Sequence, residues 1–299
     1  MTLRVGMIGA GNMAAVHVEG WAAAGDELIG VLDPDPKRAA QFSRNHTTVV
    51  VDNFAELGGS VDVVDICTPT HTHASYVEMA ADAGIDVVCE KPLARTGPDA
   101  LAAIDACDRG GVRLLVGHVV RFFPEYAAAH ALVEEGGIGT VGVVRLDRST
   151  YLPAGASAWF SDPAKSGGVV HDLMIHDVDY ARWVAGNVQR VFAKRIADPS
   201  RGDHVLATLR HEGGAITHLQ GSWAYPVGSF RTSFEIAGSD GLIVQHIATP
   251  FAGSMSTTEE VPDVPEPPSS SAESPYVTEI RHFSDAVSYT HLRAHETLG

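Results

Sequence analysis

The chain is poor in the features that mark secreted and membrane-spanning proteins. Its three cysteines, Cys67, Cys89 and Cys107, form no Cys-x-x-Cys pair, which argues against a disulfide framework or a zinc knuckle. No apolar run is long enough to cross a bilayer, and no basic segment followed by an apolar one marks a secretory signal at the N-terminus. We therefore expect a cytoplasmic protein with no membrane partner.

Positive charge is also scarce. The sequence has 21 lysines and arginines against 37 aspartates and glutamates, which gives a formal net charge of −16. Such a surface repels phosphate backbones, so we expect no nucleic-acid partner, although a local basic pocket can still take a small anion. The 299 residues suffice for two domains, and the 45% hydrophobic content is typical of globular proteins.

Strand and helix signals alternate over residues 1–120. Short apolar runs have the composition of buried parallel strands, and the stretches between them look helical and end at glycines such as Gly25 and Gly84. The apolar runs lie at residues 3–8, 28–32, 61–67, 86–89 and 112–120. This alternation predicts an α/β domain with a doubly wound parallel sheet of the Rossmann type.

The pattern changes after residue 121. We expect helices over Pro124 to Glu135, over about Val169 to Val184, and over Tyr276 to Ala286. Strand-like segments, several joined by hairpin signals, lie at 141–150, 188–196, 205–210, 215–224, 231–237 and 241–247. An antiparallel sheet with few helices predicts an α+β second domain, and the polar stretch 249–274 is expected to be a loop.

The turn after the first strand carries the dinucleotide-binding pattern Gly9-x-Gly11-x-x-Ala14. Gly9 allows the tight turn, Gly11 lets the backbone approach a pyrophosphate, and Ala14 permits close packing of helix on strand. The start of the helix, at Asn12 and Met13, supplies free N–H groups and the positive end of the helix dipole. An ordinary glycine loop is the plainer alternative, which the strand–turn–helix context disfavours.

An acidic residue at the end of the second strand points to the cofactor. Asp33 follows the glycine turn by about 20 residues, where a carboxylate accepts hydrogen bonds from the adenosine ribose and repels a 2′-phosphate. NAD is therefore favoured over NADP. Lys37 and Arg38 just downstream leave NADP open, although a solvated helix start explains them more simply.

Two further strand ends are expected to line the same crevice, because ligands bind outside the carboxyl ends of parallel strands. One carries Thr68, Pro69 and His73, and the other carries the tripeptide Glu90-Lys91-Pro92. A lysine at such a strand end can donate a hydrogen bond to a substrate hydroxyl or carbonyl oxygen. A surface lysine in a loop is the alternative.

A second group of polar residues follows Gly167-Gly168. Asp172 and His176 are four residues apart and share one face of the predicted helix, whose other residues at 173–175 are apolar. Such a pair suits proton transfer, with a capping or structural pair as the alternative. We expect no metal here, because His171 and His176 point in different directions on a helix.

Together these motifs resemble the Gfo/Idh/MocA oxidoreductase family, which includes sugar and inositol dehydrogenases. The matching pieces, in family order, are Gly9-x-Gly11-x-x-Ala14, Thr68-Pro69-Thr70-x-x-His73, Glu90-Lys91-Pro92, Arg121-Phe122 with Pro124, and Gly167-Gly168 ahead of Asp172 and His176. The resemblance implies a Rossmann domain at 1–120, then a substrate domain at 121–287 with an open, mostly antiparallel sheet. In the family this sheet commonly mediates contacts in homo-oligomers.

The resemblance also implies hydride transfer between NAD(P) and a polyol or sugar. Lys91 would bind and polarise the reacting oxygen, His176 would accept and donate the proton, and Asp172 would bind a substrate hydroxyl. The expected cofactor-binding residues are Gly9, Gly11, Asn12, Met13, Ala14, Asp33, Arg38, Thr68, Pro69, His73, Glu90, Pro92 and Arg121. Substrate contacts are expected from residues 151–160 and near Trp223.

Two departures from the family stand out. His171 precedes Asp172 where the family more often has an apolar residue. Residues 288–299 read like translated adapter, and we expect a non-native tail after a truncated reading frame. Two other functions stay open: an NAD-dependent glycoside hydrolase that uses transient oxidation, and a non-catalytic nucleotide-binding regulator. The presence of Lys91, Asp172 and His176 argues against the regulator.

Overall fold

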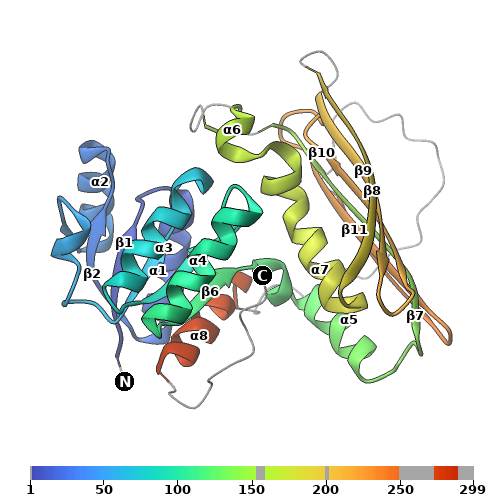
Figure 1. Cartoon of the computed structure of the whole chain (residues 1–299), viewed down its shortest axis with the longest axis horizontal. Helices are drawn as coiled ribbons and strands as arrows, with labels where there is room; N and C mark the ends of the chain where they lie inside the picture. The colour runs from blue at the N-terminus through green and yellow to red at the C-terminus, as the bar shows by residue number, and fades with distance from the viewer. Residues whose placement is uncertain (1, 153–158, 199–201, 249–272, 289–299) are drawn as a thin grey trace. The chain divides into compact units, whose positions relative to one another are not determined.

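The computed structural model describes residues 2–152, 159–198, 202–248 and 273–288. The chain divides into a first unit of residues 1–122, 162–167 and 275–299, and a second unit of residues 123–161 and 168–274 (Figure 1). Parts of the expected substrate-contacting segment, of the polar loop and of the tail lie outside the described residues. No helix among the described residues combines the length and apolarity that a membrane span needs.

The sheet of the first unit is entirely parallel and has the order β3-β2-β1-β4-β5-β6. Its strands are β1 (Arg4–Ile8), β2 (Glu27–Leu32), β3 (Val49–Val50), β4 (Val63–Ile66), β5 (Asp86–Glu90) and β6 (Leu114–Gly117). The central strands are almost wholly buried, as a sheet covered on both faces requires. The strand order reverses between β1 and β4, and such a switch point is where α/β sheets bind ligands.

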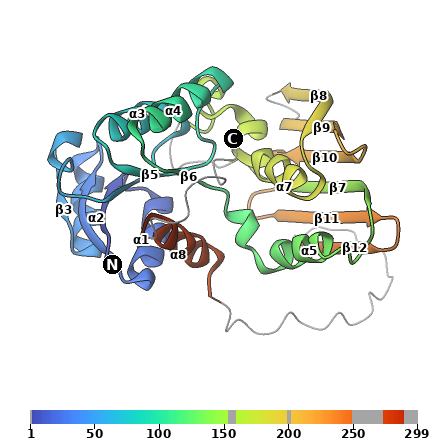
Figure 2. The ribbon, with the colours of Figure 1, turned by 60° about the horizontal axis from the view of Figure 1, so that its bottom comes forward.

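Helices cover both faces of this sheet. On one face lie α1 (Asn12–Ala24), α2 (Pro36–His46) and α8 (Pro275–Ser288), and on the other lie α3 (His73–Asp82) and α4 (Gly97–Gly110) (Figure 2). Their ends follow the sequence signals: Gly25 and Gly111 end α1 and α4 in the left-handed conformation, and Thr96 caps α4. The predicted doubly wound Rossmann fold is confirmed.

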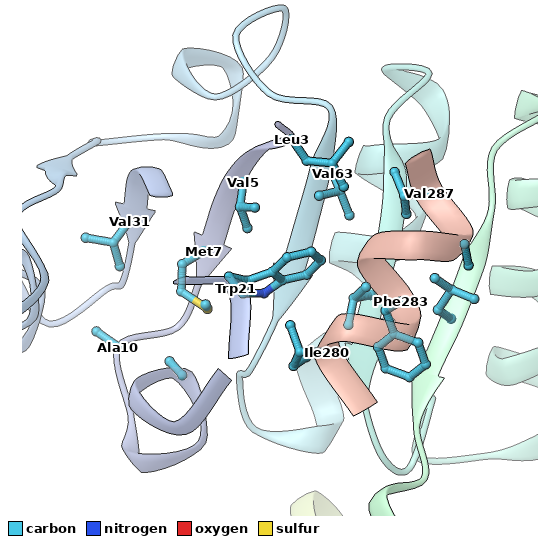
Figure 3. Packing of buried hydrophobic residues seen from close by; sticks show 14 of the residues in the cluster. Leu3, Val5, Met7, Ala10, Trp21, Val31, Val63, Ile280, Phe283 and Val287 are labelled. Atoms are coloured by element: carbon cyan, nitrogen blue, oxygen red, sulfur yellow. The ribbon is translucent and has the colours of Figure 1, made fainter. Parts of the chain in front are cut away.

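The C-terminal helix α8 belongs to the core of the first unit. Ile280, Phe283 and Val287 join the cluster that holds Trp21 (Figure 3). The close approach depends on Gly20 of α1, because a Cβ there would lie 2.6 Å from Cβ of Ile280. The predicted helix is present, and this packing adds it to the Rossmann unit, whereas chain order alone had assigned it to the second domain.

The second unit contains one six-stranded sheet with the order β12-β11-β7-β10-β9-β8. Its strands are β7 (Val141–Thr150), β8 (Val188–Asp198), β9 (Gly202–His211), β10 (Ile216–Ser222), β11 (Phe230–Gly238) and β12 (Leu242–Ala248). Among the described strands of this sheet, β7 and β10 alone pair in parallel, so the predicted mostly antiparallel sheet is confirmed. One face carries α5 (Pro124–Glu134) and α7 (Ile175–Ala185) (Figure 2).

Some elements differ from the sequence expectation. The sixth strand of the first unit stops at Gly117, because Val119–Phe122 form a 3-10 turn. Lys37 and Arg38 lie in the first turn of helix α2, which is the solvated helix start considered for them, but the extent of this helix was not predicted: Asp35 accepts hydrogen bonds from the N–H groups of both residues, and Pro36 occupies the first turn. Those residues are a recognisable helix start, but the helix is too polar to show an apolar periodicity.

A cluster of charged side chains lies within the first unit, and its three principal members are His17 of α1, Asp65 of β4 and Glu90 of β5. Nδ1 of His17 lies 3.0 Å from the Asp65 carboxylate, and Nε2 lies 3.2 Å from Oε1 of Glu90. Trp21 donates a hydrogen bond of 2.7 Å to Asp65, and the Cys67 thiol lies 3.4 Å from the same carboxylate. His17 and Asp65 are 0% exposed and Glu90 is 6% exposed.

Each member of this charged cluster needs the others to remain buried. Burial lowers the pKa of His17, but the charge and the hydrogen bond of the Asp65 carboxylate outweigh burial and raise that pKa well above its ordinary value. Burial raises the pKa of Glu90, but the hydrogen bond and charge of His17 outweigh it and give a lowered pKa. The neutral thiol of Cys67 is retained because burial raises its pKa. A protonated His17 between two carboxylates satisfies all these shifts.

The variant His17→Gln tests this charge assignment through pH. A raised pKa in the folded state stabilises the fold fully below the ordinary value of 6.5, and the benefit is lost as pH rises through the folded-state pKa. The lowered pKa of Glu90 adds to the stability of the fold at pH values above its ordinary pKa of 4.5, and this addition is lost as the pH falls through the folded-state pKa. We expect His17→Gln to lower the free energy of unfolding by about 3 kcal/mol between pH 4.5 and pH 6.5, and by less at alkaline pH.

Urea denaturation of the unaltered protein and of His17→Gln from pH 5 to pH 9 measures the difference in their free energies of unfolding. His46→Gln on α2 is the control. His46 packs against the ring of Phe42 at a tilt of 46° and lies outside the charged cluster. A destabilisation by His17→Gln that stays constant over this range would contradict a charged His17.

Candidate functional site

The glycine turn forms an open cradle at the carboxyl end of β1. Gly9 has φ +99°, and a Cβ there would lie 2.5 Å from the carbonyl oxygen of Cys67, so only glycine fits. Gly11 precedes α1 without any side-chain cap, and a Cβ on Gly11 would meet nothing within 4 Å. Asn12 is exposed, Met13 is half-buried and Ala14 is fully buried. The uncapped N–H groups and the open space suit a pyrophosphate.

Asp33 is held beside this turn by three neighbours. Its carboxylate accepts hydrogen bonds from the backbone N–H groups of Ala10 and Asp35, both at 2.8 Å. Arg38 donates from Nε to Oδ2 and from Nη2 to Oδ1 of Asp33, each at 3.0 Å, which makes a bidentate pair. Asp33 thus lies next to the glycine turn, as a ribose-binding carboxylate must. Arg38 is exposed and neutralises part of the negative charge of Asp33.

The segment after β4 is connected to the segment after β5 by His73. This side chain is 1% exposed; its Nδ1 lies 2.8 Å from the carbonyl oxygen of Pro92, and its Nε2 lies 2.7 Å from that of Thr68. Burial lowers the pKa of His73 in spite of these bonds. Thr68 and Pro69 are half-buried. The ring of His73 therefore contacts the two backbone segments that flank the expected crevice.

Lys91 is the first residue after β5 and is hydrogen-bonded to Glu90 of the charged cluster. Its backbone N–H donates a hydrogen bond of 3.0 Å to Oε2 of Glu90, the same carboxylate that contacts His17. Lys91 is half-buried and Pro92 is buried. Arg121 lies in the 3-10 turn after β6 and is half-buried. The motif Glu90-Lys91-Pro92 is thus located at the sheet edge where the sequence analysis placed it.

The structure also shows buried groups near these strand ends that the sequence analysis missed. His17 and Asp65 belong to none of the motifs used in the sequence analysis. Asp65, a charged residue inside the apolar run of β4, was nevertheless a signal of a buried polar group. The ligand-type atoms of His17, Asp65 and Cys67 lie within 4.8 Å of one another, a spacing that a metal ion also uses. The hydrogen bonds among them account for this spacing, and we interpret the group as a charge cluster.

In the second unit, Asp172 and His176 lie where a π-helical turn, Val170–Met174, leads into α7. The sequence analysis predicted a regular α-helix here, and the first turn is wider than predicted. The widened turn fits against β10 because residue 221 is glycine: a Cβ there would lie 2.1 Å from Cγ of Met174. Single π turns occur frequently at functional sites. Asp172 and His176 are half-buried, while Leu173 and Met174 are buried.

A buried ion pair anchors this helix to the sheet. Arg148 of β7 donates to the Asp177 carboxylate through Nε and Nη2, both at 3.0 Å, and also reaches the Tyr126 hydroxyl at 3.2 Å. Tyr126 in turn lies 2.7 Å from the Thr232 hydroxyl. Burial raises the pKa of Asp177 although Arg148 opposes it. Asp177 is therefore engaged by Arg148, and the pair holds this helix on β7.

The substrate-contacting residues expected from the sequence are partly described. Tyr151 makes an isolated bridge with Ala224, and Trp223 is buried. The rings of Trp159 and Phe160 stack with their centroids 4.0 Å apart. Residues 153–158 lie outside the described part of the chain.

The comparisons with known proteins agree with this geometry. Residues 3–118 match the GFO/IDH/MocA oxidoreductase family with its NAD-binding Rossmann fold, and residues 126–244 match the C-terminal domain of the same family. Inositol 2-dehydrogenase of Rhizobium meliloti is 30% identical over 268 residues, covering 86% of this chain and 79% of the relative. The 1,5-anhydro-D-fructose reductase of Ensifer adhaerens is 30% identical over 251 residues, covering 81% and 75%.

Solved structures give the same result. Levoglucosan dehydrogenase in complex with NADH and L-sorbose aligns with a TM-score of 0.76 and 27% identity, over 82% of this chain and 73% of that one. GenD2 of gentamicin A biosynthesis, in complex with NAD, aligns with a TM-score of 0.80 and 27% identity, over 96% and 86%. With the glycine turn, Asp33 and Lys91 all in place at the strand ends, the chain belongs to the Gfo/Idh/MocA family of oxidoreductases.

Proposed function

We propose that the protein transfers a hydride between a secondary alcohol of a sugar, inositol or related polyol and the nicotinamide of NAD. The observation that carries this proposal is the position of Lys91, directly after β5 in a Rossmann unit whose glycine turn is open to a pyrophosphate. The relatives named inositol 2-dehydrogenase and 1,5-anhydro-D-fructose reductase support the substrate class.

The residues divide the chemistry between them. NAD, when bound, supplies the hydride acceptor. The ammonium group of Lys91 donates a hydrogen bond to the reacting oxygen and stabilises negative charge on it. His176 accepts the hydroxyl proton, and Asp172 accepts a hydrogen bond from a substrate hydroxyl and orients the substrate. Asp172 lies in the π turn and His176 in the first turn of α7, and the Arg148–Asp177 pair fixes this helix on the sheet, so both side chains start from a defined position.

Lys91→Ala and His176→Ala test these two roles. We expect each variant to lose turnover by a factor of about 10² to 10⁴, because each removes a group that acts on the reacting proton or oxygen. NADH affinity, measured by fluorescence titration, should stay close to that of the unaltered protein. Turnover is measured as NADH formation over a panel of inositols and sugars.

His46→Ala on α2 is a matched control that should keep full turnover. Retention of full turnover by Lys91→Ala or His176→Ala on the true substrate would overturn that residue's role. Release of a sugar without net NADH formation would favour the glycoside hydrolase, and NADH binding without turnover on any substrate would favour the regulator.

We also propose that Asp33 sets a preference for NAD over NADP. Its carboxylate lies beside the glycine turn, and its partner Arg38 is a ready ligand for a phosphate once released. Asp33→Ser should lower the ratio of the NADP⁺ dissociation constant to that of NAD⁺ by about tenfold or more. In the double variant with Arg38→Ala most of that gain should vanish; an unchanged ratio in Asp33→Ser would contradict this assignment.

The open face of the second sheet is our proposed oligomer contact. Phe192, Ile196, Leu206, Ile216, Leu242 and Val244 are between 40% and 66% exposed, and the strand registers place their side chains on the face opposite α5 and α7. A sheet face that stays in water normally carries polar residues at such positions. A second copy of the chain would cover this surface. The three free cysteines favour a reducing compartment such as the cytoplasm.

Leu206→Glu, which alters the part of this surface on β9, tests the oligomer contact. We expect the unaltered protein to sediment as a homo-oligomer at micromolar concentration and the variant to shift toward the monomer, because a buried carboxylate is costly. Val227→Glu, which alters a side chain that is 80% exposed outside the strands, is the control. A monomeric unaltered protein, or an oligomer unaffected by Leu206→Glu, would contradict the proposed contact.

A further inference from the structure

Two buried histidines contact the segment Glu90–Pro92 from different helices. His73, at the start of α3, contacts the Pro92 carbonyl, and His17, in the middle of α1, contacts the Glu90 carboxylate. His73 belongs to the motifs that the sequence analysis used, whereas no function has yet been given to His17. A histidine that is 0% exposed in an alanine-rich helix needs a physical reason to be there.

The contacts of His17 lead directly to Lys91. Nε2 of His17 lies 3.2 Å from Oε1 of Glu90, and Oε2 of Glu90 accepts the backbone N–H of Lys91 at 3.0 Å. On its other side, Nδ1 of His17 lies 3.0 Å from Asp65, which is itself held by Trp21. The carboxylate of Glu90 therefore has His17 at ion-pair distance from one oxygen and accepts the Lys91 N–H with the other.

The two nitrogens of the imidazole ring lie beside two different carboxylates. Nδ1 lies within hydrogen-bond distance of Asp65, whereas Nε2 lies 3.2 Å from Oε1 of Glu90 as an ion pair without a hydrogen bond. A protonated ring is a cation between these two carboxylates, and its charge attracts both of them. A neutral ring lacks that charge and would leave the Glu90 carboxylate without this counter-charge.

We propose that His17 is a positioning residue for Lys91: through Glu90 it fixes the backbone of Lys91, and with it the place of the ammonium group in the active site. This inference rests on the proposed function for its catalytic consequence, but the link from His17 to the Lys91 backbone is independent of the reaction.

Removal of the cation releases the Glu90 carboxylate. A buried carboxylate without its counter-charge reorients toward other donors or toward water, and its bond to the Lys91 N–H weakens. The ammonium group then samples positions away from the reacting oxygen, and small displacements of such a group slow the chemical step strongly. Cofactor binding at the glycine turn and Asp33 should change little, because none of the contacts of His17 given above involves those residues.

His17→Gln, measured by hydrogen exchange, tests the structural link. Nuclear magnetic resonance of the full-length protein reports the exchange rate of the Lys91 amide, with the amides of Val87 and Val88 in β5 as internal references. We expect exchange at Lys91 to accelerate by about tenfold or more, as for the loss of a hydrogen bond to a charged group. Trp21→Phe is the matched control, since it removes the hydrogen bond of Trp21 to Asp65 but leaves the Glu90 contact.

The kinetic arm tests the consequence for the reaction. His17→Gln should lower kcat while the NADH dissociation constant changes little, and the isotope effect with a carbinol-deuterated substrate should rise as hydride transfer becomes slower. In a Lys91→Ala background, adding His17→Gln should cause no further loss, because residues that act through one another are not additive. Asp65→Asn, which weakens the hold on His17, should give the same changes to a smaller degree and replaces His17→Gln if the latter does not fold.

The outcomes separate the two claims. An unchanged Lys91 amide in a folded variant overturns the inference whatever the enzyme does. Faster exchange with unchanged kcat, or losses that multiply in the double variant, overturns the positioning role. If the unaltered protein oxidises no polyol, the proposed function fails, while accelerated exchange at Lys91 still supports the link from His17.

Discussion

The ion pairs of His17 with Asp65 and Glu90 are the interaction on which the rest of the first unit depends. A parallel sheet brings the carboxyl ends of its strands to one edge, so the polar groups that bind ligands there lie directly above a core that excludes water. Glu90 lies at that boundary, and His17 is the main neighbour that favours its charged form against the cost of burial. The same carboxylate accepts the Lys91 N–H, so the stability of the core and the placement of the expected catalytic lysine share one contact.

In the second unit, the expected catalytic side chains are positioned by backbone geometry and by a buried ion pair. Asp172 and His176 lie on a helix whose first turn is π-helical, and the extra width of that turn is accommodated by the absence of a side chain at Gly221. The pair formed by Arg148 and Asp177 then fixes how the helix is rotated on the sheet. In both units a buried charge pair lies one residue away from a residue that we expect to act on the substrate: Glu90 beside Lys91, and Asp177 beside His176. Such pairs add little net stability, but breaking one is costly, which favours a single side-chain arrangement.

Sequence patterns predict the elements that have strong periodicity or a motif. The parallel strands, the glycine turn, Asp33 and Lys91 could be found because each follows a rule that acts over a few residues. The roles of His17 and Asp65 could not, since they depend on which side chains from separate strands and helices become neighbours in three dimensions. The π turn was missed for a related reason: its cause, Gly221, lies in a strand far along the chain. The start of helix α2 could be suspected at Lys37 and Arg38, but its extent could not, because its residues are too polar to show an apolar periodicity.

Transfer of a label tests the central claim most directly. The unaltered protein is incubated with NAD⁺ and a polyol that carries deuterium on the carbinol carbon, and the nicotinamide product is analysed by mass spectrometry. Direct hydride transfer predicts reduced cofactor that carries one deuterium, together with an equal amount of the ketone. Unlabelled reduced cofactor, or sugar release without any net reduction of NAD⁺, would contradict the account.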